Sequence, residues 1–71
     1  MIDRLLKYIE TVDREKRERN ITPTYTTALS ASIALGISKE QVLTLAKVLQ
    51  RANKIRIGDT ISDSYFEIVR T

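Results

Sequence analysis

The sequence predicts a mostly α fold with a small β-sheet, in which three helices are followed by a C-terminal β-hairpin. Apolar residues recur at helical spacing in the first and third helical stretches, which gives each of them one side to bury, and a short uncharged stretch rich in small residues lies between them. The last stretch alternates apolar and polar residues around turn-forming residues, which is typical of two paired strands. With 71 residues, the chain is long enough for one small core. We therefore treat 1–71 as a single domain.

The first predicted helix covers residues 2–20. Its apolar residues share one face, with Tyr8 at the edge: Ile2, Leu5, Leu6, Ile9 and Val12. Beyond Asp13 the apolar side stops and oppositely charged residues follow at i,i+4 spacing, as in the pairs Asp13/Arg17, Arg14/Glu18 and Glu15/Arg19. We expect this end to be a solvated, charge-stabilised helix terminus. Contact of its cations with phosphates or a partner chain is the alternative.

The second predicted helix covers residues 25–35. Pro23 ends the preceding helix because it lacks an amide donor and forces its neighbour into an extended conformation. Thr24 or Thr26 is suited to cap the new helix. This helix is uncharged and rich in small residues, which allow close helix packing. Its expected inward residues are Tyr25, Leu29, Ser32 and Ile33.

The third predicted helix covers residues 39–52. Gly36 is suited to end the second helix in a left-handed conformation, and Ser38 with Gln41 forms a capping-box pattern at the start of the third. Its expected core side is Val42, Leu45, Ala46, Leu49 and Ala52, and its opposite side is Glu40, Thr44, Lys47 and Arg51. Asn53 suits a left-handed residue after the helix.

The predicted hairpin covers residues 54–69. Ile55, Arg56 and Ile57 alternate as in a strand, and the dipeptides 58–59 and 62–63 are typical of turns. In the second strand we expect Phe66 and Ile68 to face the core, with Tyr65, Glu67 and Val69 on the other side.

The positive charge is concentrated in one region. The chain has a formal net charge of +3. Residues 38–57 carry the cations Lys39, Lys47, Arg51, Lys54 and Arg56 against the single carboxylate of Glu40, whereas the segment after them carries Asp59, Asp63 and Glu67. A cationic third helix and following strand favour binding to an anionic partner such as nucleic acid.

Several classes of function are not expected. The chain has no cysteine and no histidine, so the common nucleophile–base pairs and thiolate or imidazole metal sites are missing. Its two glycines do not form a phosphate-binding loop. We therefore expect no enzymatic activity, no catalytic residue, no metal, no cofactor and no small-molecule site. No apolar run is long enough to span a membrane, so we expect a cytoplasmic protein without a membrane partner.

A family resemblance follows from the central stretch. Leu35-Gly36-Ile37-Ser38, then Val42, Leu49 and a turn residue before Ile55, resembles the winged helix-turn-helix family of small prokaryotic and phage-type DNA-binding domains. The resemblance implies a short first strand, which Ile21-Thr22 is placed to supply. The chain departs from the family pattern at three positions: Ala31 stands where leucine is usual, Asn53 where glycine is usual, and Lys54 where an apolar residue is usual.

The resemblance implies a small transcriptional regulator or mobile-element accessory factor that inserts the helix 39–52 into the major groove of double-stranded DNA. Lys39, Gln41 and Thr44 are then candidates for base edges or phosphates, with Gln41 suited to adenine and Lys39 to guanine. The other candidates for phosphate contact are Lys47, Arg51, Lys54 and Arg56. Asp59 and Asp63 argue against contact between the hairpin turn and DNA, because carboxylates and phosphates repel.

Two other interpretations stay open. Lys39, Lys47 and Arg51 also fit an ordinary solvated helix face. Leu43 and Val48 flank the surface that would face DNA, where polar residues are usual. An apolar pair at that place favours a protein interface. The alternative function is therefore a protein-interaction or dimerisation module, a homodimer or a complex with another protein, built on the same scaffold without DNA binding.

Overall fold

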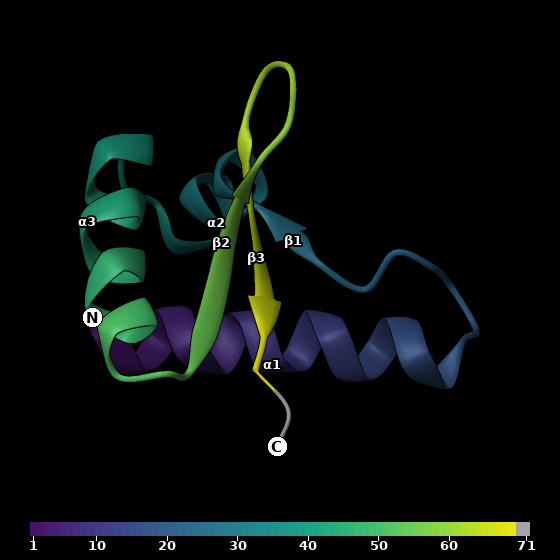
Figure 1. Ribbon diagram of the computed structural model, residues 1–71. Helices are drawn as coiled ribbons and strands as arrows, with labels where there is room; N and C mark the ends of the chain where they lie inside the picture. Colours follow the sequence, from purple (N-terminus) through teal and green to yellow (C-terminus); the bar gives the residue numbers. More distant parts are fainter. Residues whose placement is uncertain (70–71) are drawn as a thin grey trace.

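The computed structural model describes residues 1–69. Within them the chain forms three helices and three short strands, in the order α1 (Ile2–Glu18), β1 (Thr26–Thr27), α2 (Ala28–Leu35), α3 (Lys39–Arg51), β2 (Ile55–Asp59) and β3 (Ser64–Ile68). The strands form one antiparallel sheet. Figure 1 shows α1 running below the other elements, with α3 beside the β2–β3 hairpin. The predicted mostly α class with a small β-sheet is confirmed.

The sheet has the strand order β1-β3-β2, so β3 lies in the middle. Phe66 of β3 is opposite Ile57 of β2 on one side and Thr26 of β1 on the other. The hairpin pairs strands that are neighbours in sequence, whereas β1 reaches β3 from before α2. β1 thereby joins the start of α2 to the hairpin.

The core lies between the helices and one side of the sheet. The fully buried large residues are Leu5 and Ile9 of α1, Val42 of α3, Ile55 of β2 and Phe66 of β3. Burial of one such side chain stabilises the fold by roughly 1.5–3 kcal/mol. Leu45, expected in the core, is only half-buried, and Ala52 is exposed because α3 ends at Arg51.

The predicted turn between the second and third helices is confirmed. Gly36 ends α2 with φ 68° and ψ 33°, a left-handed conformation. The Ser38 hydroxyl accepts a hydrogen bond from the Gln41 amide at 3.1 Å, and the Gln41 side chain accepts one from the Ser38 amide at 3.1 Å. Asn53, with φ 58°, supplies the left-handed residue after α3. These local signals set where α3 begins and where it ends.

The second helix differs from the prediction. It begins at Ala28, since Thr26 and Thr27 form β1; the first strand is therefore not Ile21-Thr22. Thr27 is the cap residue, and its hydroxyl accepts from the Ser30 amide at 3.2 Å. Pairing of Thr26 with Phe66 fixes how the chain begins α2, and the small residues Ala28, Ala31 and Ser32 then face the core. The larger Leu29 and Ile33 point outward, contrary to expectation.

The end of α1 and the hairpin turn also differ in detail. Helix α1 stops at Glu18, and of the three predicted charge pairs the described residues show an ion pair for Asp13 with Arg17, at 3.1 Å. The hairpin turn lies at residues 60–63, where the Thr60 amide donates to the Asp63 carbonyl at 2.7 Å. Gly58 and Asp59 belong to β2 rather than to a turn. The helices of residues 1–69 are too short or too polar to span a bilayer.

Candidate nucleic-acid interface

The outward side of α3 carries the predicted polar residues. Glu40, Thr44, Lys47 and Arg51 are all exposed, because Val42, Ala46 and Leu49 fix the opposite side of the helix against the core. The polar side of α3 therefore faces solvent, because the apolar side packs against the core.

Four exposed cations continue from this face onto the first residues of the hairpin. Within residues 1–69, no hydrogen bond or ion pair engages the side chains of Lys47, Arg51, Lys54 and Arg56. The backbone between α3 and β2 is nevertheless held firmly: the Lys54 amide donates to the Leu49 carbonyl at 3.0 Å, and its carbonyl accepts from the Val69 amide at 3.1 Å. Lys47, Arg51 and Lys54 are therefore free side chains on a fixed backbone, whereas Arg56 lies opposite Glu67 in the register of β2 and β3. We call these four residues the α3–β2 cation cluster.

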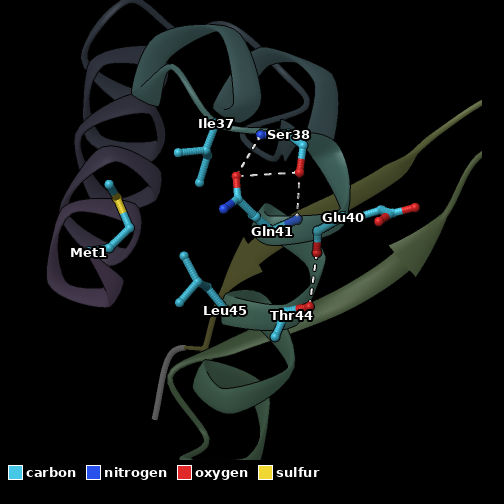
Figure 2. A pocket seen from close by; sticks show the side chains of 7 residues that line it. All are labelled: Met1, Ile37, Ser38, Glu40, Gln41, Thr44 and Leu45. Carbon is cyan, nitrogen blue, oxygen red and sulfur yellow. Dashed lines mark hydrogen bonds between the residues drawn. The ribbon is translucent and has the colours of Figure 1, made fainter.

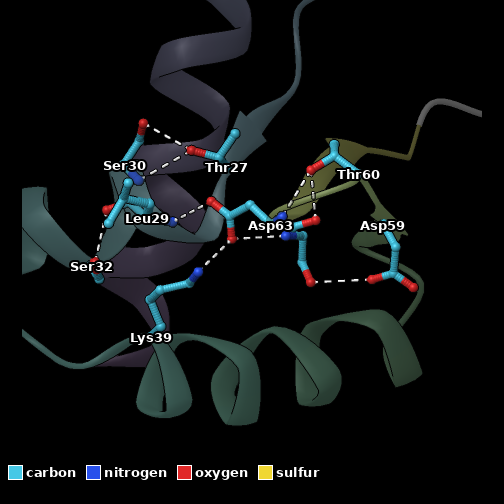
Figure 3. Close-up of polar contacts among 9 residues, drawn as sticks. Thr27, Leu29, Ser30, Ser32, Lys39, Asp59, Thr60 and Asp63 are labelled. Carbon is cyan, nitrogen blue, oxygen red and sulfur yellow. Dashed lines mark hydrogen bonds and ion pairs between the residues drawn. The ribbon is translucent and has the colours of Figure 1, made fainter.

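Lys39 does not belong to this cluster. Its ammonium forms an ion pair with the carboxylate of Asp63 at 3.1 Å, and the two side chains are 43% and 13% exposed. Asp63 also accepts hydrogen bonds from the Leu29 amide at 3.1 Å and from the Ser64 amide at 2.8 Å. Figure 3 shows this carboxylate between the start of α2 and Lys39. The hairpin turn is thus fastened to both helices, and Lys39 is already neutralised.

The surroundings of Asp63 stabilise its charged form. Burial alone raises the pKa of this carboxyl, but the hydrogen bonds from Lys39, Ser64 and Leu29 and the positive charge of Lys39 lower it more, so the net pKa lies below the ordinary value. Of the two carboxylates expected to repel phosphates at the hairpin turn, Asp63 is therefore paired with the ammonium of Lys39. Asp59, by contrast, is exposed and accepts a hydrogen bond from the Ser64 hydroxyl at 3.2 Å.

Gln41 and Thr44 are exposed but partly engaged. The carbonyl oxygen of the Gln41 amide already accepts from the Ser38 amide, so a bidentate pair with adenine would require this cap to break. The Thr44 hydroxyl donates to the Glu40 carbonyl at 2.9 Å and keeps its acceptor capacity. Both side chains line an open groove of about 510 Å³ between α3 and the start of α1, together with Met1, Ile37, Ser38, Glu40 and Leu45 (Figure 2).

Leu43 and Val48 do not form one exposed apolar pair. Leu43 is half-buried and packs against the core, whereas Val48 is 47% exposed. The two residues on which the predicted protein interface depended therefore differ in burial.

The contact of Asp63 with Leu29 and Lys39 could not be found from the sequence. Asp63 and Leu29 are separated by 34 positions, and an aspartate beside a serine in a turn carries no signal for a distant partner. No group of acidic residues within 1–69 is arranged to hold a metal ion. Comparison of the chain with protein-family models, curated proteins and solved structures gave no match.

Proposed function

We propose that the chain is a winged helix-turn-helix domain that binds double-stranded DNA through α3 and the start of β2. The observation that carries the proposal is the α3–β2 cation cluster, whose four members are exposed and unpaired within residues 1–69. An unpaired cation gains more from a phosphate than one that already has a carboxylate partner. It also displaces counterions from the DNA, and their release strengthens binding.

The order of the elements supports the same proposal. A strand and two helices joined by the turn at Gly36 precede the hairpin, as the family resemblance implies. In such a domain α3 is the helix that enters the major groove. Lys47, Arg51, Lys54 and Arg56 then contact phosphates, and the free amide nitrogen of Gln41 and the Thr44 hydroxyl reach base edges. The biological role that we propose is a small prokaryotic or phage transcriptional regulator or mobile-element accessory factor.

A binding titration tests the proposal. The purified chain is titrated into a fluorescent pool of mixed-sequence duplexes at several salt concentrations. We expect an affinity that falls steeply as salt rises, with a logarithmic slope of about −0.9 for each neutralised phosphate. Replacement of both Lys47 and Arg51 by alanine should flatten the slope by nearly two such contacts.

The matched control replaces two exposed cations of α1, Lys7 and Arg14, by alanine. This variant has the same net charge as the α3 double variant but keeps the α3–β2 cation cluster. The proposal fails if no duplex binds at low salt, or if the two double variants lose affinity equally. Selection of bound fragments from a genomic pool would then identify the preferred sequence.

A further inference from the structure

The helix α2 is apolar on both of its sides. Its inner side, with Ala28 and Ala31, is buried in the core. On its outer side Leu29 is 51% exposed and Ile33, one turn later, is 73% exposed. A helix that is apolar all round is normally covered on both sides. Within residues 1–69 nothing covers the outer side, which we define as Leu29, Ser30, Ile33 and Ala34 and call the α2 outer face.

The apolar surface extends onto the neighbouring hairpin turn. Asp63 of that turn accepts a hydrogen bond from the Leu29 amide at 3.1 Å, which places the turn beside the first residues of α2. Ile61 of the same turn is fully exposed. Large apolar side chains are therefore exposed on two neighbouring elements, and exposed groups of this kind mark interaction surfaces.

The α2 outer face carries no charged side chain, although the chain as a whole is positive and the hairpin beside it exposes the carboxylate of Asp59. Residues 21–37 contain no charged side chain. The cation that follows them, Lys39, is neutralised by Asp63 at 3.1 Å. The α3–β2 cation cluster begins in the second half of α3, and Figure 1 shows that the C-terminal end of this helix lies away from the hairpin turn. The positive charge of the chain therefore lies outside the α2 outer face, whose four residues are all uncharged.

We propose that the α2 outer face binds a second copy of this chain. Two copies repel each other wherever their cations meet, so a stable contact between them needs a face without net charge, and this face satisfies that condition. A symmetric contact also needs a self-complementary surface. Leu29 and Ile33 form a ridge beside the small Ser30 and Ala34, so the ridge of one helix fits the row of small residues on an antiparallel partner.

The charge pattern also favours a second copy of this chain over nucleic acid or a charged protein as the partner. Nucleic acid would find no cation on the α2 outer face, and a charged protein partner would find no opposite charge. The homodimer buries the apolar residues and leaves the α3–β2 cation cluster of each copy exposed. An eight-residue helix is about 12 Å long, so the interface is small and the dimer weak, with a dissociation constant on the order of 10–100 µM.

Sedimentation velocity over a concentration series tests the proposal without DNA. We expect the sedimentation coefficient to rise from the monomer value at about 1 µM to the dimer value near 1 mM. Ile33→Asp should remain monomeric over the whole series, with an unchanged circular dichroism spectrum because the side chain is mostly exposed. The matched control is Val48→Asp, which also places a carboxylate at an exposed apolar position but lies on α3, and it should dimerise like the original chain.

Cross-linking provides a second readout, which does not require a charged residue to be introduced into the dimer contact. The chain has no cysteine, so Ala34→Cys gives one thiol on the α2 outer face and Glu10→Cys gives one on α1. A short bifunctional thiol reagent should trap the first variant as a dimer much faster than the second. A monomer at the highest concentration, equal cross-linking rates, or an Ile33→Asp variant that still dimerises would each overturn the proposal.

Discussion

The ammonium of Lys39 lies 3.1 Å from the carboxylate of Asp63, which joins the first residue of α3 to the turn of the hairpin. The same carboxylate accepts the Leu29 amide hydrogen at 3.1 Å, so one side chain connects α2, α3 and the hairpin. It thereby satisfies a backbone donor in the first turn of α2, which has no partner inside that helix. The hairpin turn, whose acidic residue Asp63 was the only feature visible in the sequence, therefore connects three elements of the fold.

Asp63→Asn should lower the stability of the fold. The amide keeps the shape of the side chain but loses the ion pair with Lys39 and accepts more weakly from Leu29. Loss of a helix-capping interaction typically costs about 1 kcal/mol, and the partly exposed ion pair adds up to about 1 kcal/mol. Urea denaturation at neutral pH measures the change. Equal midpoints for the two proteins would show that the junction contributes nothing.

The contribution of Asp63 should also depend on pH. Its pKa is lowered in the folded chain from the ordinary 3.8, so the folded state favours the carboxylate. The associated stability is present above the unfolded pKa and is lost as pH falls through the folded pKa. The stability difference between the original chain and Asp63→Asn should therefore narrow below about pH 4. Lys39→Met, which keeps the two amide hydrogen bonds to Asp63, should retain part of the dependence.

Lys39 and Lys47 should contribute differently to the proposed DNA binding. Lys39 already has a carboxylate partner, whereas Lys47 has none within residues 1–69. Lys47→Ala should reduce the salt slope by about one phosphate contact, and Lys39→Ala should change it less. Parallel titrations of both variants across the same salt series give the comparison. A larger effect of Lys39 would show that DNA displaces Asp63 from this lysine.

Leu43→Asp should lower the stability of the fold much more than Val48→Asp. Leu43 packs against the core, so a carboxylate there is expected to cost on the order of 2 kcal/mol or more. Val48 is exposed, and its replacement should change the stability by less than about 0.5 kcal/mol. Thermal unfolding of both variants tests the difference. If Leu43→Asp unfolds at the original temperature, this side chain is not part of the core.

Gly58→Ala and Gly36→Ala should both destabilise the fold, but for different reasons. A methyl group at Gly58 would overlap the ring of Tyr65, whereas Gly36 has open space but a φ of +68°. Each change should cost about 1–2 kcal/mol, the first from overpacking and the second from a left-handed alanine. In a chain that also carries Tyr65→Ala, Gly58→Ala should no longer lower the free energy of unfolding, whereas Gly36→Ala should lower it as before. Two double-mutant cycles measure this difference. Additivity in both cycles would contradict the steric explanation.

The local sequence predicted much of the backbone. Gly36, the Ser38–Gln41 capping box and Asn53 adopt the expected conformations, because each depends on residues within one helical turn. The spacing of Val42, Ala46 and Leu49 likewise oriented α3, so the exposed positions of Lys47 and Arg51 followed from periodicity alone. These predictions needed no information about distant segments.

Tertiary contacts decided what periodicity left ambiguous. In α2 apolar residues occur all round the helix, so hydrophobicity could not choose the inward side; pairing of Thr26 with Phe66 made that choice and left Leu29 and Ile33 outside. The partner of Lys39 was also a tertiary outcome, since Asp63 reaches it only when the hairpin folds back beside α2. The sequence by itself determined the elements, their caps and the location of positive charge. The structure decided which cations are free and which apolar side chains lack a cover, because both depend on contacts between residues far apart in the chain.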